Sequence, residues 1–179
     1  MQDYRKFYIN GEFVEPVAPR DFAVIDPATE QPFATISLGS AADVAIAVAA
    51  ARAAFKTFSK TSIEERIALL ERIQATYLAR AGDLTEAMTA EIGAPKVISE
   101  TAQLMMGLAH FPETIRLLNT FEFSEQIGER TTIVKRPVGV CGLITPWNWP
   151  RNQILCKVLP AFATGCTMIF KPSEFAPIY

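Results

Sequence analysis

The chain lacks an excess of basic charge, because 17 Lys and Arg residues stand against 19 Asp and Glu residues in 179. Proteins that bind the phosphate backbone of nucleic acids need such an excess, so no nucleic-acid partner is expected. Long hydrophobic runs are also missing. A membrane span needs about 18–20 apolar residues in a row, and the amino terminus has no signal-peptide core, so no membrane partner is expected either.

Cysteine and histidine are scarce, with three Cys and one His. An odd cysteine count without paired spacing favours a reducing compartment, so we expect a cytoplasmic protein without disulfides. The pattern predicts no metal site, and His110 is expected to be a packed or surface side chain. Cys141, Cys156 and Cys166 are predicted to be core thiols. Among them Cys156, beside Lys157, is the better candidate for a reactive thiol.

Apolar residues make up 50% of the chain and include 12 Phe, which argues against disorder. Within the first forty residues, Asn10-Gly11 between two β-prone runs predicts a hairpin over residues 6–14. Two further short strands are predicted at residues 22–25 and 33–37, around an Asp26-Pro27 turn. The amino-terminal part is therefore expected to be rich in β-structure.

Apolar residues then recur at helical spacing as far as residue 120, which predicts a layer of four helices. The predicted caps and stops are, in chain order, Ser40 with Asp43, either Thr61 with Glu64 or Ser62 with Glu65, and a stop at Gly93 and Pro95. The fourth helix should begin near Val97, and Pro112 either kinks it or starts a new turn.

The last sixty residues change character twice. Residues 121–136 are polar and strand-like, which predicts a hairpin or arm with few core-facing side chains. An apolar strand at residues 138–144, a helix that ends at Gly165 and a strand at residues 167–170 then form one βαβ unit. We expect its two strands to be parallel and buried, with a right-handed crossover.

Ligands of open α/β sheets bind beyond the carboxyl ends of the strands, and two polar segments follow these strands. In the first, the Asn148 amide could donate a hydrogen bond to a developing oxyanion. The alternative is an aromatic plug made by Trp147 and Trp149. In the second, Lys171 and Glu174 could bind ribose hydroxyls, or they could form only an exposed ion pair.

Three motifs in this order resemble the aldehyde dehydrogenase superfamily: Ile144-Thr-Pro-Trp-Asn-Trp-Pro, Lys157-Val-Leu-Pro-Ala, and Gly165-Cys-Thr-Met-Ile-Phe-Lys-Pro-Ser-Glu. The resemblance implies an α/β fold in which an N-terminal β-hairpin and helical layer lead into the first βαβ unit of an open Rossmann-like cofactor domain. Residues 1–120 would form the N-terminal part of that domain, residues 121–136 an oligomerisation arm, and residues 137–179 the βαβ unit, truncated.

The resemblance also implies NAD(P)-dependent oxidation of an aldehyde to a carboxylic acid through a cysteine thiohemiacetal and thioester. Asn148 would stabilise the oxyanion. The cofactor-binding residues implied are Ile144, Thr145, Pro146, Trp147, Lys171, Ser173 and Glu174. The Glu174 carboxylate would repel the extra phosphate of NADP, so NAD is the expected cofactor. The expected partners are an aldehyde substrate and further copies of the family member in a homo-oligomer.

Two features depart from the family pattern. Arg151 stands where the family usually has an apolar residue, and it either alters the substrate entrance or is solvated. The sequence also stops at Tyr179, before the family's nucleophilic cysteine and general-base glutamate, so we expect residues 1–179 alone to be inactive. Two alternatives stay open: a non-catalytic interaction or complementation module, and a semialdehyde or acylating member of the superfamily.

Overall fold

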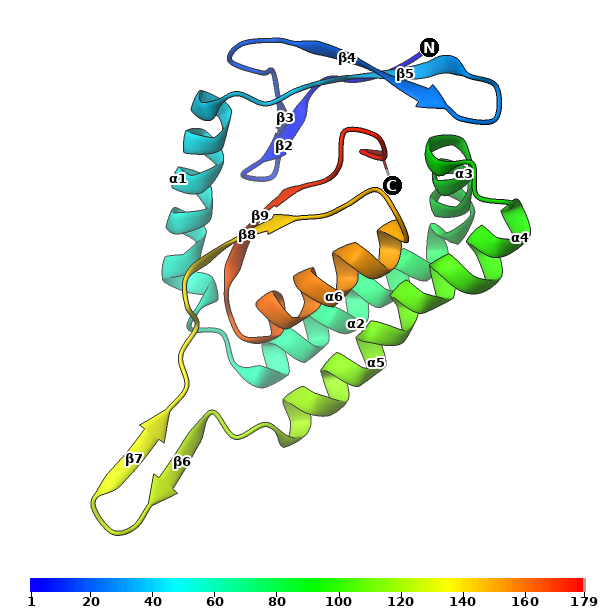
Figure 1. Cartoon of the computed structure of the whole chain (residues 1–179). Helices are drawn as coiled ribbons and strands as arrows, with labels where there is room; N and C mark the ends of the chain where they lie inside the picture. The colour runs from blue at the N-terminus through cyan, green and yellow to red at the C-terminus, as the bar shows by residue number, and fades with distance from the viewer. Residues whose placement is uncertain (179) are drawn as a thin grey trace.

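The computed structural model describes residues 1–178 and runs from small amino-terminal sheets through a helical layer to one parallel strand pair (Figure 1). The strands are β1 (Gln2–Tyr4), β2 (Phe7–Ile9), β3 (Glu12–Val14), β4 (Asp21–Asp26), β5 (Gln31–Ser37), β6 (Ser124–Ile127), β7 (Thr131–Val134), β8 (Val140–Ile144) and β9 (Thr167–Lys171). The helices are α1 (Ala41–Phe58), α2 (Ile63–Ala79), α3 (Ala81–Ile92), α4 (Lys96–Ile98), the π-helical turn η1 (Ser99–Gln103), α5 (Leu104–Thr120) and α6 (Pro150–Ala163).

The amino-terminal strands follow their turn signals. Strands β2 and β3 form the predicted hairpin, and Asn10 and Gly11 both have positive φ, 55° and 87°, as a two-residue hairpin turn requires. Strands β4 and β5 lie at the two predicted strand positions, and they pair in antiparallel fashion around the buried residues Val24, Ala34 and Ile36. The parallel addition of β1 to β5 was not predicted, because it joins segments about thirty residues apart.

The helix starts carry capping boxes. At α1 the Ser40 hydroxyl accepts from the Asp43 N–H, and the Asp43 carboxylate accepts from the Ser40 N–H at 2.8 Å. The start of α2 decides between the two predicted caps, because Ser62 and Glu65 form the box there. Helix α3 ends at Gly93, whose φ of 64° is left-handed, as predicted.

The predicted fourth helix is three consecutive pieces, α4, η1 and α5, because a π-helical turn interrupts its hydrogen-bond pattern at residues 99–103. Pro112 lies inside α5, so it does not start a new helix. No helix within residues 1–178 has both the length and the hydropathy to cross a bilayer.

Strands β6 and β7 pair as an antiparallel hairpin, as the polar composition predicted, and every residue in them is exposed. Figure 1 shows this hairpin extending away from the helices and from the other sheets. Its role as an oligomerisation arm remains a prediction.

Strands β8 and β9 are parallel and are connected through α6, which confirms the βαβ unit. The expectation that both strands are buried is wrong for the described residues: Gly142, Ile144 and Lys171 are exposed, and the rest are half-buried. The cause is the width of the sheet. With only two strands, each strand has one unpaired edge, although α1 and α6 both contact the pair.

The main core lies between α2, α3, α5 and α6. Its buried members are Leu70, Tyr77, Met88, Leu104, Phe111, Leu118, Leu155, Leu159 and Ala163. Helices α2, α5 and α6 meet at Gly107, where an added Cβ would lie 2.7 Å from Tyr77 Oη and 2.9 Å from Arg151 Cβ. Tyr77 cannot easily yield, since its hydroxyl donates to the Leu104 carbonyl at 2.8 Å.

We expect Gly107→Ala to lower the free energy of unfolding by about 1–3 kcal/mol, because the new methyl group overpacks this crossing. The matched control is Gly82→Ala in α3, where an added Cβ meets nothing within 4 Å. That change should be neutral or stabilise by up to about 1 kcal/mol through helix propensity. Urea unfolding of both variants tests the difference, and equal effects would contradict it.

Asp43 provides a second, pH-dependent test. Its carboxylate is 5% exposed and also accepts from the Val17 N–H at 2.8 Å. The Ser40 hydroxyl, followed by the Val17 and Ser40 amides, lowers the pKa of Asp43 below 3.8. The ionised carboxylate therefore stabilises the folded state above pH 3.8, and this contribution is lost as pH falls through the lower folded pKa.

Asp43→Asn should accordingly be less stable than the wild type at neutral pH, and the two should converge in acid. Urea unfolding at a series of pH values measures the difference. A difference that stays constant, or that widens as the pH falls, would show that the Asp43 charge is not what stabilises this cap.

Candidate functional site

The strand register brings the two predicted site segments together at one edge. Ile144, the last residue of β8, lies opposite Lys171, the last residue of β9. The Thr145 N–H then donates to the Lys171 carbonyl at 3.3 Å, just beyond the paired strands. Because the strands are parallel, the turn after β8 and the segment after β9 leave the sheet side by side.

The turn from β8 into α6 is sharp and strained. Trp149 has φ 48° and ψ 53°, a left-handed conformation that costs a non-glycine residue about 1–3 kcal/mol. Pro150 follows as the first residue of α6 and is buried, so the helix starts at once. Trp147 and Trp149 are 54% and 41% exposed, so they do not form the aromatic plug considered as the alternative.

Asn148 lies at the apex of this turn. Its side chain is exposed, and within residues 1–178 it makes no hydrogen bond. The Thr145 hydroxyl beside it has the opposite character, since Thr145 is 4% exposed and Oγ1 has no hydrogen-bond partner among the described residues. Buried hydroxyls are normally bonded, so this unpaired group fits a polar ligand at the turn.

The segment after β9 carries an ion pair. Lys171 Nζ lies 3.0 Å from Glu174 Oε2, and both side chains are solvent-accessible. The backbone N–H of Glu174, together with Lys171, lowers the pKa of the Glu174 carboxyl, so it is charged at neutral pH. Ser173 is buried, and its hydroxyl accepts from the Phe175 N–H at 3.3 Å, which fixes the turn that presents Glu174.

These groups fit a dinucleotide. The Glu174 carboxylate can accept hydrogen bonds from ribose hydroxyls, and the Lys171 ammonium group can donate to them. The turn after β8 adds the unpaired Thr145 hydroxyl and the exposed Trp147 indole. The structure thus places Ile144, Thr145, Pro146 and Trp147 at the same sheet edge as Lys171, Ser173 and Glu174. Asn148 lies in the same turn, between β8 and α6, so its side-chain amide is a hydrogen-bond donor next to these residues.

Arg151 is not solvated, which removes one of its two predicted roles. It is 7% exposed and packs beside Tyr77 at the Gly107 crossing.

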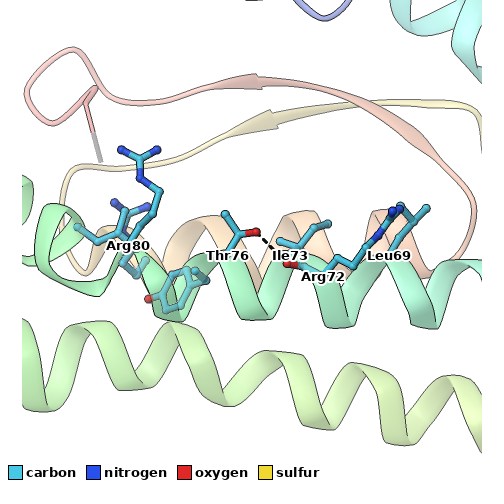
Figure 2. A pocket seen from close by; sticks show the side chains of 8 residues that line it. Leu69, Arg72, Ile73, Thr76 and Arg80 are labelled. Atoms are coloured by element: carbon cyan, nitrogen blue, oxygen red, sulfur yellow. Dashed lines mark hydrogen bonds between the residues drawn. The ribbon is translucent and has the colours of Figure 1, made fainter.

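A cavity of about 410 Å³ lies along α2 beside Arg151, and Figure 2 shows side chains of α2 directed into it. The residues that line it are Leu69, Arg72, Ile73, Thr76, Tyr77, Arg80, Leu84 and Arg151. Burial raises the pKa of Tyr77 to about 12, so its hydroxyl stays protonated. Neither Asn148 nor Lys171 lines this cavity.

Two contacts that sequence patterns did not reveal hold α6 in place. Arg66 is buried and donates from Nη1 to the Ala163 carbonyl at 2.9 Å, at the end of α6, where a cation is favoured. Nη2 donates to the Thr61 carbonyl at 2.6 Å. At the other end, His110 Nε2 lies 2.8 Å from Asn152 Oδ1. The available signal was the position of Arg66 between Ile63 and Ile67, inside the apolar stripe of α2.

The prediction that all three cysteines are core thiols holds for Cys166 alone, since Cys141 and Cys156 are only half-buried. Lys157 Nζ lies 3.8 Å from Cys156 Sγ, so the expected neighbour is present. Lys157 Nζ also donates to the Gln153 side-chain oxygen at 2.9 Å and to the Gln153 backbone carbonyl at 3.1 Å, so its charge is shared among three acceptors.

A sequence model of the Aldehyde dehydrogenase family matches residues 13–179. The 3-succinoylsemialdehyde-pyridine dehydrogenase of a Pseudomonas species is 48% identical over 178 residues, which are 99% of this chain and 37% of that protein. The crystal structure of an aldehyde dehydrogenase from Bartonella henselae matches with a TM-score of 0.96 and 44% identity, over 99% of this chain and 38% of that one. The crystal structure of an aldehyde dehydrogenase from Mycobacterium tuberculosis in complex with NAD+ matches with a TM-score of 0.93 and 30% identity. That match covers 99% of this chain and 38% of the other. The chain therefore spans little more than a third of the length of these relatives.

We expect Arg66→Lys to destabilise the fold by about 1–3 kcal/mol, because lysine keeps the charge but cannot reach both Thr61 and Ala163. Arg72→Lys is the matched control, since Arg72 is exposed on the same helix. Urea unfolding of both variants measures the effect. A loss in Arg72→Lys as large as in Arg66→Lys would contradict the anchoring role.

Proposed function

The chain belongs to the aldehyde dehydrogenase family, and we propose that it forms the region of an NAD-dependent aldehyde dehydrogenase that holds the cofactor and stabilises the reaction's oxyanion. The observation that carries this proposal is the register of β8 with β9, which sets the Asn148 turn beside the Lys171–Glu174 pair. The proposed substrate is a small-molecule aldehyde, and the proposed location is the cytoplasm.

The cofactor-holding residues in this proposal are Ile144, Thr145, Pro146, Trp147, Lys171, Ser173 and Glu174. Glu174 accepts from the adenosine ribose hydroxyls while Lys171 donates to them, and the charge of Glu174 disfavours the additional phosphate of NADP. Ser173 holds the turn in which Glu174 lies. NAD, when bound, supplies the acceptor for the hydride that leaves the substrate carbon.

Asn148 acts on the substrate side. When a cysteine thiolate of the complete enzyme adds to the aldehyde, the carbonyl oxygen becomes an oxyanion, and the Asn148 amide donates to it. Such a donor is effective when it is oriented toward the oxyanion before the reaction. The support for this role is twofold: the amide has no competing hydrogen bond among the described residues, and the strained Trp149 backbone presents it at the apex of the turn.

The β6–β7 hairpin has a separate proposed role. Four-residue strands with every side chain exposed cannot form a core of their own, and Ile127, Ile133 and Val134 are apolar. We place this hairpin as the arm through which copies of the complete enzyme assemble into a homo-oligomer.

The test is a chimera that joins residues 1–179 to the part of the Pseudomonas relative that follows its matched region. The chimera should reduce NAD in the presence of an aldehyde, and residues 1–179 alone should not, because none of their cysteines lies in the Asn148 turn. Asn148→Ala in the chimera should lower kcat about 10²–10³-fold, as expected for loss of an oxyanion donor.

Asn119→Ala, an exposed asparagine on α5, is the matched control and should leave kcat unchanged. If Asn148→Ala keeps full kcat in an active chimera, the oxyanion role is wrong. The proposal that residues 1–179 need the remaining part of the enzyme for catalysis is wrong if residues 1–179 alone, shown intact by mass spectrometry, reduce NAD in the presence of an aldehyde.

A further inference from the structure

The first turn of α6 carries a hydrogen-bonded polar pair that the proposed reaction leaves without a role. His110 on α5 donates from Nε2 to Asn152 Oδ1 at 2.8 Å. Because an amide oxygen can only accept, the proton of this bond belongs to the imidazole. The bond occupies the Asn152 oxygen and leaves its two N–H donors, which make no hydrogen bond within residues 1–178. Asn152 is therefore a fixed amide whose donors are available to a ligand.

The position of this pair relates it to the substrate. Asn152 lies in α6, four residues after Asn148 in the chain. Helix α6 contacts β8 and β9 on one side and packs against α5 on another (Figure 1). The Lys171–Glu174 segment, which follows β9, belongs to the strand side. A substrate that approaches Asn148 from the side away from the cofactor therefore meets the interface between α5 and α6.

A second polar side chain lies at this interface. Gln103 is in η1, which contacts α6, and it precedes Gly107 by four residues, so the two share a helix face. Gly107 lies against Arg151 and Leu155 of α6. Gln103 is 6% exposed, and its Oε1 has no hydrogen-bond partner among the described residues. Buried amides are normally bonded, so this oxygen also fits a polar ligand between the helices.

The charges of the two helices favour an electron-rich group beside Asn152. Helix α6 contains no acidic residue. Glu113 is the only acidic residue of α5, and its carboxylate pairs with Arg116 at 2.7 Å. No unpaired carboxylate of α5 or α6 therefore competes for the Asn152 donors. The complementary ligand group is a hydrogen-bond acceptor, such as a carbonyl or carboxylate oxygen.

We propose that Asn152, held in place by His110, selects aldehydes that carry a second hydrogen-bond acceptor, a carbonyl or carboxylate oxygen, over plain alkanals. The inference rests on the proposed function, since it needs the reacting carbonyl at Asn148. The two asparagines then have different effects. Asn148 binds the oxygen that becomes charged and acts on kcat, whereas Asn152 binds a group that does not react and acts on KM. His110 is a positioning residue.

The first test compares kcat/KM of the chimera for three aldehydes of similar length. These are 4-oxobutanoate, which carries a carboxylate, 4-oxopentanal, which carries a ketone, and pentanal, which has no second acceptor. At least one acceptor-bearing aldehyde should exceed pentanal by about tenfold, as one hydrogen bond contributes. The aldehyde that does so identifies the acceptor group.

Substitution of Asn152 separates the amide from the rest of the chimera. Asn152→Asp keeps the size and an oxygen that accepts from His110, but it replaces both donors by a negative charge. It should raise KM for the preferred aldehyde at least about tenfold and change kcat little. Asn152→Leu should also remove the preference, and both variants should oxidise pentanal like wild type. Asn119→Asp, an exposed asparagine on α5, is the matched control and should keep the preference.

A pair of His110 variants tests the positioning role. His110→Leu leaves the Asn152 amide free to rotate, so the ratio of kcat/KM between the preferred aldehyde and pentanal should fall. His110→Gln retains an N–H donor and should restore part of that ratio. A merely structural role would instead lower activity toward all three aldehydes by the same factor.

The outcomes separate this inference from the proposed function. The inference is wrong if the wild-type chimera oxidises all three aldehydes equally well, or if both Asn152 variants keep the wild-type preference. Equal losses on pentanal and on the preferred aldehyde would contradict it as well. A folded chimera that oxidises none of the three contradicts the proposed function itself, and the inference then falls with it.

Discussion

The parallel pairing of β8 with β9 is the constraint on which the other features of this chain depend. Five residues on each strand pair in register, and the Thr145 N–H extends the bonding one step further, to the Lys171 carbonyl. Both strand ends are thereby fixed relative to each other. Helix α6 must then cross back within a short distance, which is why it starts at Pro150 and is anchored at Ala163 by Arg66.

The two ends of this strand pair have different chemistry. At the carboxyl ends, a strained turn and an ion pair expose groups that are able to bind polar ligands. At the amino-terminal ends, Cys166 is buried just before β9 and Cys141 is half-buried within β8. Arg66 connects these regions, since it holds the end of α6 and lies against Gly165, next to Cys166. A single buried cation thus holds the end of α6 beside the turn that leads into β9.

Much of the fold could be predicted because its signals are local. Asn10-Gly11 and the Ser40–Asp43 box each act within four residues, and the three motifs between Ile144 and Glu174 identified the site segments together with the family. What could not be predicted depends on contacts between distant segments. The pairing of β1 with β5 and the bond from Arg66 to Ala163 produce no periodic pattern in the sequence. The exposure of β8 depends on the number of strands beside it, which its own residues do not determine.

The central claim is that the Lys171–Glu174 pair and the Asn148 turn together form a cofactor and oxyanion site. A crystal structure of the chimera with NAD+ tests it most directly. Adenosine ribose hydroxyls should lie within hydrogen-bond distance of Lys171 and Glu174, with Asn148 facing the reactive part of the site. A ribose bound elsewhere, with the Lys171–Glu174 ion pair still closed on itself, would contradict it.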